Sequence, residues 1–264
     1  MVLKGKAGDG LVTPEEARAA GLSFDDPPEP KCRFCGRGLE PLGAVLLGQV
    51  RWVSHEACGC EGELAEQAER ERREREEAEA AMARRVAESG IKKRFRSAQT
   101  SIPAAVSYLG RFGDIQGRGL YFRGGVGAGK TTAASAIARA LVYTGYSVIV
   151  TTTLEMLDSI QDTYGTGSKS AEGVGRYGRC DLLVLDDLGK EDATEWSVGT
   201  VFSVLDARYE DMRPTIVTSN YAPGALADRL ARRGERVTAE AIASRISQTC
   251  RPVYLGGRDR RRLG

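Results

Sequence analysis

The sequence predicts an α/β domain with a parallel sheet, and three observations support that fold class. From about residue 91 onward, short apolar runs alternate with helical patterns, as they do in successive βα units. A glycine-rich loop of the form G-x-x-x-x-G-K-[ST] separates one of these runs from the helix after it, which is the setting of a phosphate-binding loop. The run Leu182-Leu183-Val184-Leu185 is apolar on both faces, as a central strand of a parallel sheet should be.

The individual elements follow from the same alternation. The strands are predicted at residues 119–122, 147–152, 181–185, 215–218 and 252–255, and the helices at about 130–144, 154–163, 195–211, 223–232 and 239–248. Residues 165–178 are rich in glycine and polar side chains, so a mobile surface loop is expected there.

Composition divides the chain into three parts. Residues 1–60 hold four of the six cysteines and open with a capping box at Thr13 and Glu16, which predicts a short helix. Residues 61–89 consist mainly of Glu, Arg and Ala, with opposite charges three and four apart, for example Glu69 with Arg73 and Glu66 with Arg70. Such pairs support an exposed helix. We interpret this part as a helical linker, with a partner-binding or self-associating helix as the alternative, and residues 90–264 as the α/β domain.

The phosphate-binding loop runs from Gly124 to Thr131 and reads GGVGAGKT. Glycines let the backbone turn its N–H groups toward phosphate oxygens, and the following helix adds its positive N-terminus. Lys130 can reach the β- and γ-phosphates, and the Thr131 hydroxyl can hold Mg²⁺. A chance match in a glycine-rich turn is the alternative, but the strand before the loop and the helix after it oppose that interpretation. The predicted nucleotide-binding residues are Gly125, Val126, Gly127, Ala128, Gly129, Lys130, Thr131 and Thr132.

Polar residues follow two of the predicted strands. Asp186 and Asp187 end the apolar run at 182–185, which is the Walker B arrangement. Asp186 is placed to orient Mg²⁺ and Asp187 to polarise an attacking water. Asn220 ends the next strand in the sequence Thr-Ser-Asn and could point at the γ-phosphate, although these residue types also favour turns.

The order GGVGAGKT, LLVLDDLG, TSN and ASRIS resembles the AAA+ ATPases. Within that class it is similar to the DnaC-type helicase loaders of bacteria and phages and to the related IstB transposition helpers. The segments around 89–95 and 249–259 share the resemblance, which covers about residues 89–262. It implies an AAA+ P-loop domain, a three-layer αβα sandwich with a five-stranded parallel sheet.

The resemblance also implies roles for individual residues. Lys130, Thr131 and Asp186 would bind Mg-ATP, Asp187 would activate water, and Asn220 would act as sensor I. Many AAA+ enzymes have Glu where this chain has Asp187, so slow hydrolysis is expected. Arg245 would be an arginine finger that reaches the γ-phosphate of a neighbouring subunit, with Arg229 as the competing candidate. A finger that acts on a neighbour implies self-association into an AAA+ oligomer.

The cysteines of residues 1–60 are spaced as metal ligands. Cys32 and Cys35 form a C-x₂-C pair, and Cys58 and Cys60 form a C-x-C pair. Four thiolates suit a tetrahedral, structural Zn²⁺ site. His55, the single histidine, could replace one cysteine, and free thiols or a disulfide are the alternative to a metal. Some loaders of the DnaI kind also carry an N-terminal zinc module that contacts the helicase, whereas enteric DnaC proteins lack zinc there.

Charge does not by itself identify a nucleic-acid partner. The chain has 38 Lys and Arg against 36 Asp and Glu, so binding would need local basic patches. Three clusters are candidates for binding single-stranded DNA, although a basic cluster is often only solvated surface: Lys92, Lys93, Arg94 and Arg96 around Phe95; Lys169, Arg176, Tyr177 and Arg179; and Arg258, Arg260, Arg261 and Arg262.

Together these features predict a cytoplasmic protein without a membrane partner. The function expected from the resemblance is ATP-dependent loading of a DnaB-type replicative helicase onto single-stranded DNA. The alternatives are an IstB-like ATPase helper of a transposase, and a nucleotide-binding adaptor with negligible hydrolysis. The expected cofactors are ATP, Mg²⁺ and Zn²⁺.

Overall fold

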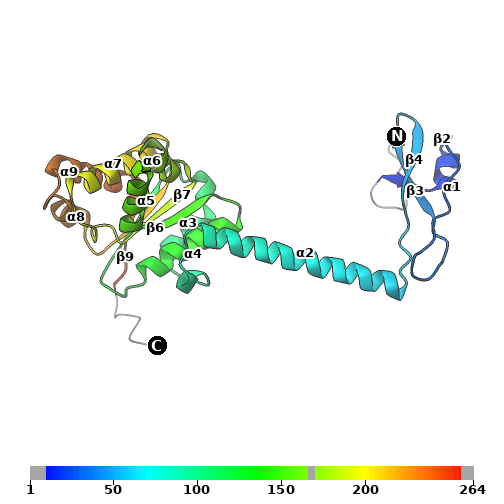
Figure 1. Ribbon diagram of the computed structural model, residues 1–264, viewed down its shortest axis with the longest axis horizontal. Helices are drawn as coiled ribbons and strands as arrows, with labels where there is room; N and C mark the ends of the chain where they lie inside the picture. Colours follow the sequence, from blue (N-terminus) through cyan, green and yellow to red (C-terminus); the bar gives the residue numbers. More distant parts are fainter. Residues whose placement is uncertain (1–9, 166–169, 257–264) are drawn as a thin grey trace. The chain divides into compact units, whose positions relative to one another are not determined.

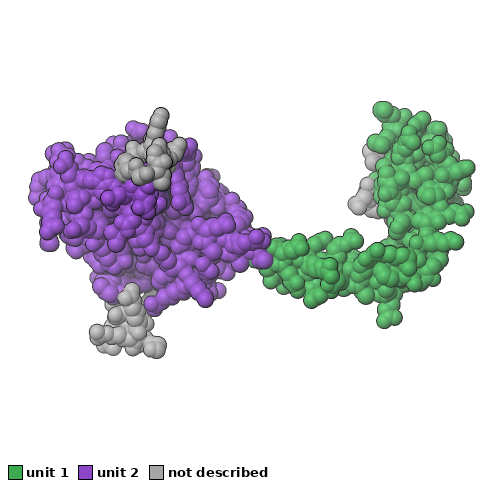
Figure 2. All heavy atoms as spheres, viewed as in Figure 1, with its two compact units in different colours: residues 1–79 green, residues 80–264 purple. Residues whose placement is uncertain are grey.

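The computed structural model describes residues 10–165 and 170–256. The chain forms two compact units, residues 1–79 and 80–264 (Figure 2). The division falls within the long helix α2 (Glu61–Glu88) (Figure 1). The domain boundaries predicted from composition, after residues 60 and 89, lie instead at the two ends of that helix.

The first unit is a small sheet with little apolar core. Its strands are β1 (Leu11–Val12), β2 (Ser23–Phe24), β3 (Pro41–Leu46) and β4 (Gln49–His55), in the order β1-β3-β4-β2. The short helix α1 (Pro14–Ala19) begins with the expected capping box, in which Thr13 and Glu16 cap each other's backbone N–H groups. Its buried apolar cluster consists of Val12, Ala17 and Val50, with Leu22, Phe24 and Trp52 packed against them.

The second unit contains a five-stranded parallel sheet. Its strands are β5 (Gly119–Arg123), β6 (Val148–Thr152), β7 (Leu182–Asp186), β8 (Thr215–Ser219) and β9 (Cys250–Tyr254). They lie in the order β6-β7-β8-β5-β9, and each neighbouring pair is parallel. Because all strands run the same way, the carboxyl ends of β5, β7 and β8 lie at one edge of the sheet. The phosphate loop, the Asp pair and Asn220 follow those three ends.

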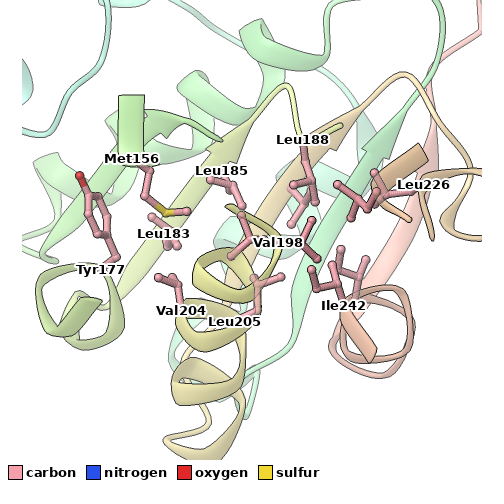
Figure 3. Close-up of a cluster of buried hydrophobic side chains, with 14 of the residues drawn as sticks. Met156, Tyr177, Leu183, Leu185, Leu188, Val198, Val204, Leu205, Leu226 and Ile242 are labelled. Atoms are coloured by element: carbon pink, nitrogen blue, oxygen red, sulfur yellow. The ribbon is translucent and has the colours of Figure 1, made fainter. Parts of the chain in front are cut away.

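Helices cover both faces of this sheet, which is the three-layer arrangement expected. Leu183 and Leu185 of β7 face α5 (Thr153–Gly165), α7 (Glu195–Glu210), α8 (Pro223–Leu230) and α9 (Arg236–Thr249) in one core (Figure 3). Leu182 and Val184 face the opposite core, made with α3 (Pro103–Gly110), α4 (Lys130–Tyr143) and the end of α2. Successive side chains of β7 therefore pack into the two cores in turn, because neighbouring residues of a strand point to opposite faces of the sheet.

The end of α2 is attached to the sheet of the second unit. Gly90 follows the helix at φ +83°, and a Cβ there would lie 2.1 Å from the carbonyl oxygen of Val150. The backbone N–H of Val150 in β6 donates to the Ser89 carbonyl at 2.7 Å. Glycine is needed at this position because its left-handed backbone comes so close to a strand.

The mobile loop expected at residues 165–178 was a wrong prediction over most of its length. Residues 170–179 form the helix α6 (Ser170–Arg179). Its Tyr177 is buried in the core with Met156 and Leu183 (Figure 3). Glycines lower helix propensity by only about 1 kcal/mol each, so burial of Tyr177 and Val174 on one face outweighs them.

Candidate nucleotide site and candidate metal centre

The phosphate loop connects β5 to the N-terminus of α4. Gly124 has φ +154°, and a Cβ there would lie 2.2 Å from the Leu255 carbonyl oxygen. Gly129, the residue before the helix, is left-handed at φ +90°. Both positions therefore need glycine. The 14-residue helix α4 directs its free N–H groups and its positive dipole end at the loop, which suits an anionic ligand.

Lys130 is buried at the centre of this loop, with 6% of its surface exposed. Its ammonium donates to the carbonyl oxygens of Gly124 and Gly125, each at 2.9 Å. It also donates to Oδ1 of Asn220 at 2.8 Å. Two residues that are 90 positions apart in the sequence thus meet in one site, as their places at the ends of adjacent strands β5 and β8 require.

Thr131 and Asp186 face each other across the same site. The Thr131 hydroxyl lies 3.0 Å from both carboxylate oxygens of Asp186. Asp186 is buried, and burial raises the pKa of its carboxyl above the ordinary value, against the opposing hydrogen bond from Thr218. A divalent cation favours the ionised form of a carboxylate beside it. One hydroxyl and one buried carboxylate are oxygen ligands of the kind Mg²⁺ takes, so these residues fit that ion.

Thr218 links the two aspartates, and sequence reasoning did not single it out. Its fully buried hydroxyl donates to Oδ1 of Asp186 at 2.6 Å and accepts from the backbone N–H of Asp187 at 2.9 Å. This contact crosses from β8 to the end of β7. The signal in the sequence was the polar Thr at the end of an apolar strand, which was interpreted only as part of the approach to Asn220.

Asp187 adopts a left-handed backbone with φ +62°, which is uncommon for a residue other than glycine. Its carboxylate accepts from Lys190 Nζ at 2.5 Å. The Asp187 side chain therefore lies beside a cation of its own loop.

A cavity of about 200 Å³ joins these groups. Its wall contains residues 126–132 of the loop together with Asp187, Lys190 and Asn220. Arg94 and Phe95, from the 3₁₀ turn η1 (Lys93–Phe95), complete it. Both residues belong to the basic cluster around Phe95 that the sequence offers as a candidate for DNA binding. Both residues lie in the segment just before the phosphate-loop domain, and this position in the sequence could have indicated a nucleotide contact.

The two candidate arginine fingers are engaged within their own subunit. Arg245 of α9 donates through Nε to Oδ1 of Asp206 in α7 at 2.8 Å, and its guanidinium lies 4.0 Å from the centre of the Tyr209 ring. Arg229 of α8 donates to the Glu191 carbonyl oxygen at 3.0 Å. Neither residue lines the cavity described above.

The structure places the proposed DNA-binding clusters differently from the prediction. Lys92 forms an ion pair with Glu155. Tyr177 is buried, so its ring cannot stack on a base, and the prediction for this residue was wrong. Arg176 and Arg179 are exposed on α6. Lys169 and the arginines at positions 258 and 260–262 lie outside the described residues.

The four cysteines of the first unit meet in one cluster. Their sulfur atoms all lie within 4.8 Å of one another: Cys32, Cys35, Cys58 and Cys60. The Cys32–Cys60 sulfurs are 3.6 Å apart and the Cys35–Cys58 sulfurs 3.3 Å apart. Ligands on a tetrahedral zinc with bonds of about 2.3 Å are about 3.8 Å from each other. The cluster therefore allows a zinc site.

His55 does not belong to this cluster. Its Nδ1 lies 3.0 Å from the carbonyl oxygen of Glu56. Backbone N–H groups of Cys35 and Phe34 lower the pKa of Cys32 to about 7, whereas the neighbouring Cys35 thiol raises the pKa of Cys58 to about 12. Four thiols this close cannot all ionise without a cation between them, which is what a metal would supply.

Linker pairing follows the prediction only in part. Glu69 pairs with Arg73 at 2.8 Å in α2, as the spacing predicted. Glu66 pairs with Arg33 of the cysteine module instead of with Arg70.

None of the described helices is both long and apolar enough to cross a bilayer.

Comparison with known proteins agrees with this site. The family model for the IstB-like ATP binding protein matches residues 61–263. The replicative helicase loader DnaI of Bacillus subtilis (strain 168) is 31% identical over 151 residues, which is 55% of this chain and 48% of that protein. The replicative helicase loader DnaC of Escherichia coli (strain K12) is 28% identical over 100 residues, 38% of this chain and 41% of that protein. The chain thus spans less than half the length of these curated relatives.

Two solved structures share the fold of the second unit. The crystal structure of the DnaC helicase loader superposes with a TM-score of 0.54 at 22% identity, covering 62% of this chain and 100% of that one. The crystal structure of the DnaI superposes with a TM-score of 0.51 at 27% identity, covering 58% of this chain and 84% of that one. The chain therefore belongs to the IstB-like ATP binding protein family, with an AAA+ P-loop domain of the kind found in the DnaC and DnaI loaders.

Proposed function

We propose that this protein is an ATP-dependent loader of a replicative DNA helicase onto single-stranded DNA. The observation that carries the proposal is the site itself: Lys130, Thr131, Asp186 and Asn220 meet at one edge of the sheet, in a chain whose named relatives are helicase loaders. The cysteine cluster adds a second module, which would dock on a DnaB-type helicase. Such a protein would act in the cytoplasm.

The site residues divide the work of binding and hydrolysis. Lys130 and the backbone N–H groups of residues 125–132 would hold the phosphates of ATP. Thr131 and Asp186 would hold Mg²⁺, which supplies positive charge beside the phosphates. Asp187 would orient water, and Asn220, already in contact with the Lys130 ammonium, would report the γ-phosphate. ATP would favour one assembly state through contacts that the other state lacks.

Arg245 would complete the site of a neighbouring subunit in an oligomer. To do so it must leave Asp206 and the Tyr209 ring, two contacts that each contribute on the order of 1 kcal/mol. Arg229 is the less favoured finger, because its guanidinium already supports the backbone of the loop after β7.

The test is reconstitution with the replicative helicase of the same host. We expect a complex on gel filtration, and ATP-dependent transfer of the helicase to a single-stranded circle. Lys130→Ala should abolish transfer. Arg245→Ala should also abolish it, and mixing Arg245→Ala with Lys130→Ala subunits should restore part of the ATPase, because each supplies what the other lacks. A parallel mixture with Arg229→Ala serves as the matched control. The absence of any complex, with or without ATP, would overturn the loader assignment.

Two specific observations keep the alternatives in view. The family model is named for IstB-like proteins, so an ATPase helper of a transposase is the second candidate. Duplex DNA binding and stimulation of a transposase, without a helicase complex, would favour it.

The Lys190 cation beside Asp187 favours a nucleotide-binding adaptor. Equal, negligible phosphate release from the wild type and Lys130→Ala, with single-stranded DNA present, would support that role.

A further inference from the structure

A second cavity lies at the opposite edge of the parallel sheet from the nucleotide site. It has a volume of about 320 Å³ and is formed by α3, the 3₁₀ turn η2 (Phe112–Asp114) and the starts of β5 and β9. The phosphate loop follows the carboxyl end of β5, whereas this cavity contains Gly119 and Leu120 at its amino end. The five residues of β5 separate the two sites by about 16 Å.

Three arginines converge on this cavity from separate parts of the chain. Arg111 follows α3, Arg118 precedes β5 and Arg251 lies on the edge strand β9. Within the described residues none of the three has a carboxylate in ion-pair range. Asp114 also lines the wall, so the lining carries three positive charges and one negative charge.

Local structure accounts for only one of these cations. Arg111 lies at the C-terminus of α3, where a basic side chain stabilises the negative end of the helix dipole. Arg118 and Arg251 do not lie within a helix, and among the described residues neither has a carboxylate in ion-pair range. Positive charges left together in a concave wall strengthen the potential inside it, which makes the cavity attractive to an anion.

Tyr108 forms part of the cavity lining, but its hydroxyl is closed to the cavity. The residue is more than nine-tenths buried, and its hydroxyl lies in the protein interior without a hydrogen-bond partner among the described residues. The arginines therefore carry the attraction for an anion.

We propose that this cavity binds a phosphate group of a nucleic-acid backbone, through Arg118, Arg251 and Arg111. Guanidinium groups form bidentate hydrogen bonds with phosphate oxygens. The Tyr108 ring is buried and packs edge-on against Phe112, so no aromatic face is offered to a base and the recognition is independent of sequence. The inference deepens the proposed function, because it names residues that would hold the DNA.

The test measures binding of the full chain to a 20-nucleotide oligo(dT) by fluorescence anisotropy over a range of salt concentrations. The variant Arg118→Gln/Arg251→Gln removes two cations and keeps side-chain size. We expect about tenfold weaker binding at low salt, and a slope of log K against log salt that is smaller by about 1.4, since each phosphate contact on a single strand contributes about 0.7. Arg118→Lys/Arg251→Lys should restore part of the affinity, which separates lost charge from lost folding.

The matched control removes two exposed arginines of the same unit that have no ion pair among the described residues, Arg84→Gln/Arg232→Gln. It should change affinity by less than about twofold. An equal loss in both double variants would overturn the proposal, because net charge alone would explain it. Inorganic phosphate that binds the wild type but not the Arg118/Arg251 variant, with oligo(dT) affinity unchanged, would overturn the nucleic-acid assignment. The measurement needs neither helicase nor hydrolysis, so failure of the loader proposal is distinguishable from failure of this one.

Discussion

Lys190 holds the carboxylate that is expected to activate water. Its ammonium lies 2.5 Å from Oδ2 of Asp187, and both residues line the nucleotide cavity. The ion pair keeps the carboxylate turned toward its own loop. This orientation weakens Asp187 as a base for water, in addition to the shorter reach of Asp compared with Glu.

Lys190→Ala should therefore raise the rate of ATP hydrolysis. We expect an increase of up to about tenfold in kcat, a small part of the roughly 10²–10⁴-fold that a positioned general base contributes. Steady-state phosphate release measures it, with Lys190→Arg as the control that keeps the charge. Asp187→Ala should abolish hydrolysis in both backgrounds. A lower kcat for Lys190→Ala would show instead that this lysine acts on the phosphates.

At the scale of residues, the sequence predicted identities better than contacts. Motif spacing was sufficient to single out Lys130, Asp186 and Asn220, because Lys130 begins the helix after the phosphate loop and the other two lie where strands end. It could not show that Thr218 joins the two aspartates, because a strand-end threonine has several common uses. Nor could it place Phe95 in the nucleotide cavity, since that depends on how the chain before β5 folds back.

Among the elements, the loop after β7 is supported by an unusual buried carboxylate. Glu191 is 3% exposed, and one of its oxygens accepts from the Gly189 N–H at 2.9 Å. Its other oxygen has no hydrogen-bond partner among the described residues. Burial raises the pKa of Glu191, against the opposing backbone hydrogen bonds and the nearby Arg229 charge. The loop that carries Asp187 and Lys190 is thus fixed to α8 through this residue and Arg229.

The stability of the second unit should consequently depend on pH through Glu191. The folded pKa lies above the unfolded value of about 4.3, so the contribution is fully present below that pH and is lost as pH rises through the folded pKa. Glu191→Gln does not titrate. We expect its urea midpoint to gain on the wild type as pH rises from 4 to 7. Trp196 fluorescence in a Trp52→Phe background reports this unit alone, because the chain has 2 tryptophans, one in each unit. A constant difference at every pH would contradict the role of Glu191.

The helices and strands show where periodicity succeeds as a predictor. The five strands of the parallel sheet lie within about two residues of their predicted positions, because each is an apolar run bounded by clear breaks. Helix α6 was missed because four of its 10 residues are glycine or serine and only Val174 and Tyr177 indicate its apolar face. Helix α6 is stabilised by packing against α5 and α7, and such tertiary contacts cannot be predicted from local helix propensity.

For the whole molecule, the two units have different sources of stability. The second unit has two apolar cores, one on each face of its sheet. Among its described residues, the first unit has one small buried apolar cluster, formed by Val12, Ala17 and Val50. Units of about 70–80 residues rarely fold on such a core alone and commonly use a metal or disulfides. The cysteine cluster is the evident substitute for a core, since among the described residues all cysteines are free thiols.

Loss of one cysteine should therefore unfold the first unit and spare the second. Cys58→Ser removes one of the four candidate zinc ligands, and binding of a structural zinc contributes on the order of 10 kcal/mol to folding. We expect zinc content near zero and a red shift of Trp52 emission in a Trp196→Phe background, because Trp52 packs edge-on against Phe24 and donates to the Asp25 carbonyl at 3.0 Å. ATP hydrolysis should stay within about twofold of the matched background, whereas the helicase complex should be lost if the first unit is its docking module.

His55→Asn is the matched control and should retain zinc, since His55 lies outside the cluster. Loss of zinc from His55→Asn would show that His55 is a ligand in place of one cysteine. Full zinc content in Cys58→Ser would exclude the four-cysteine site.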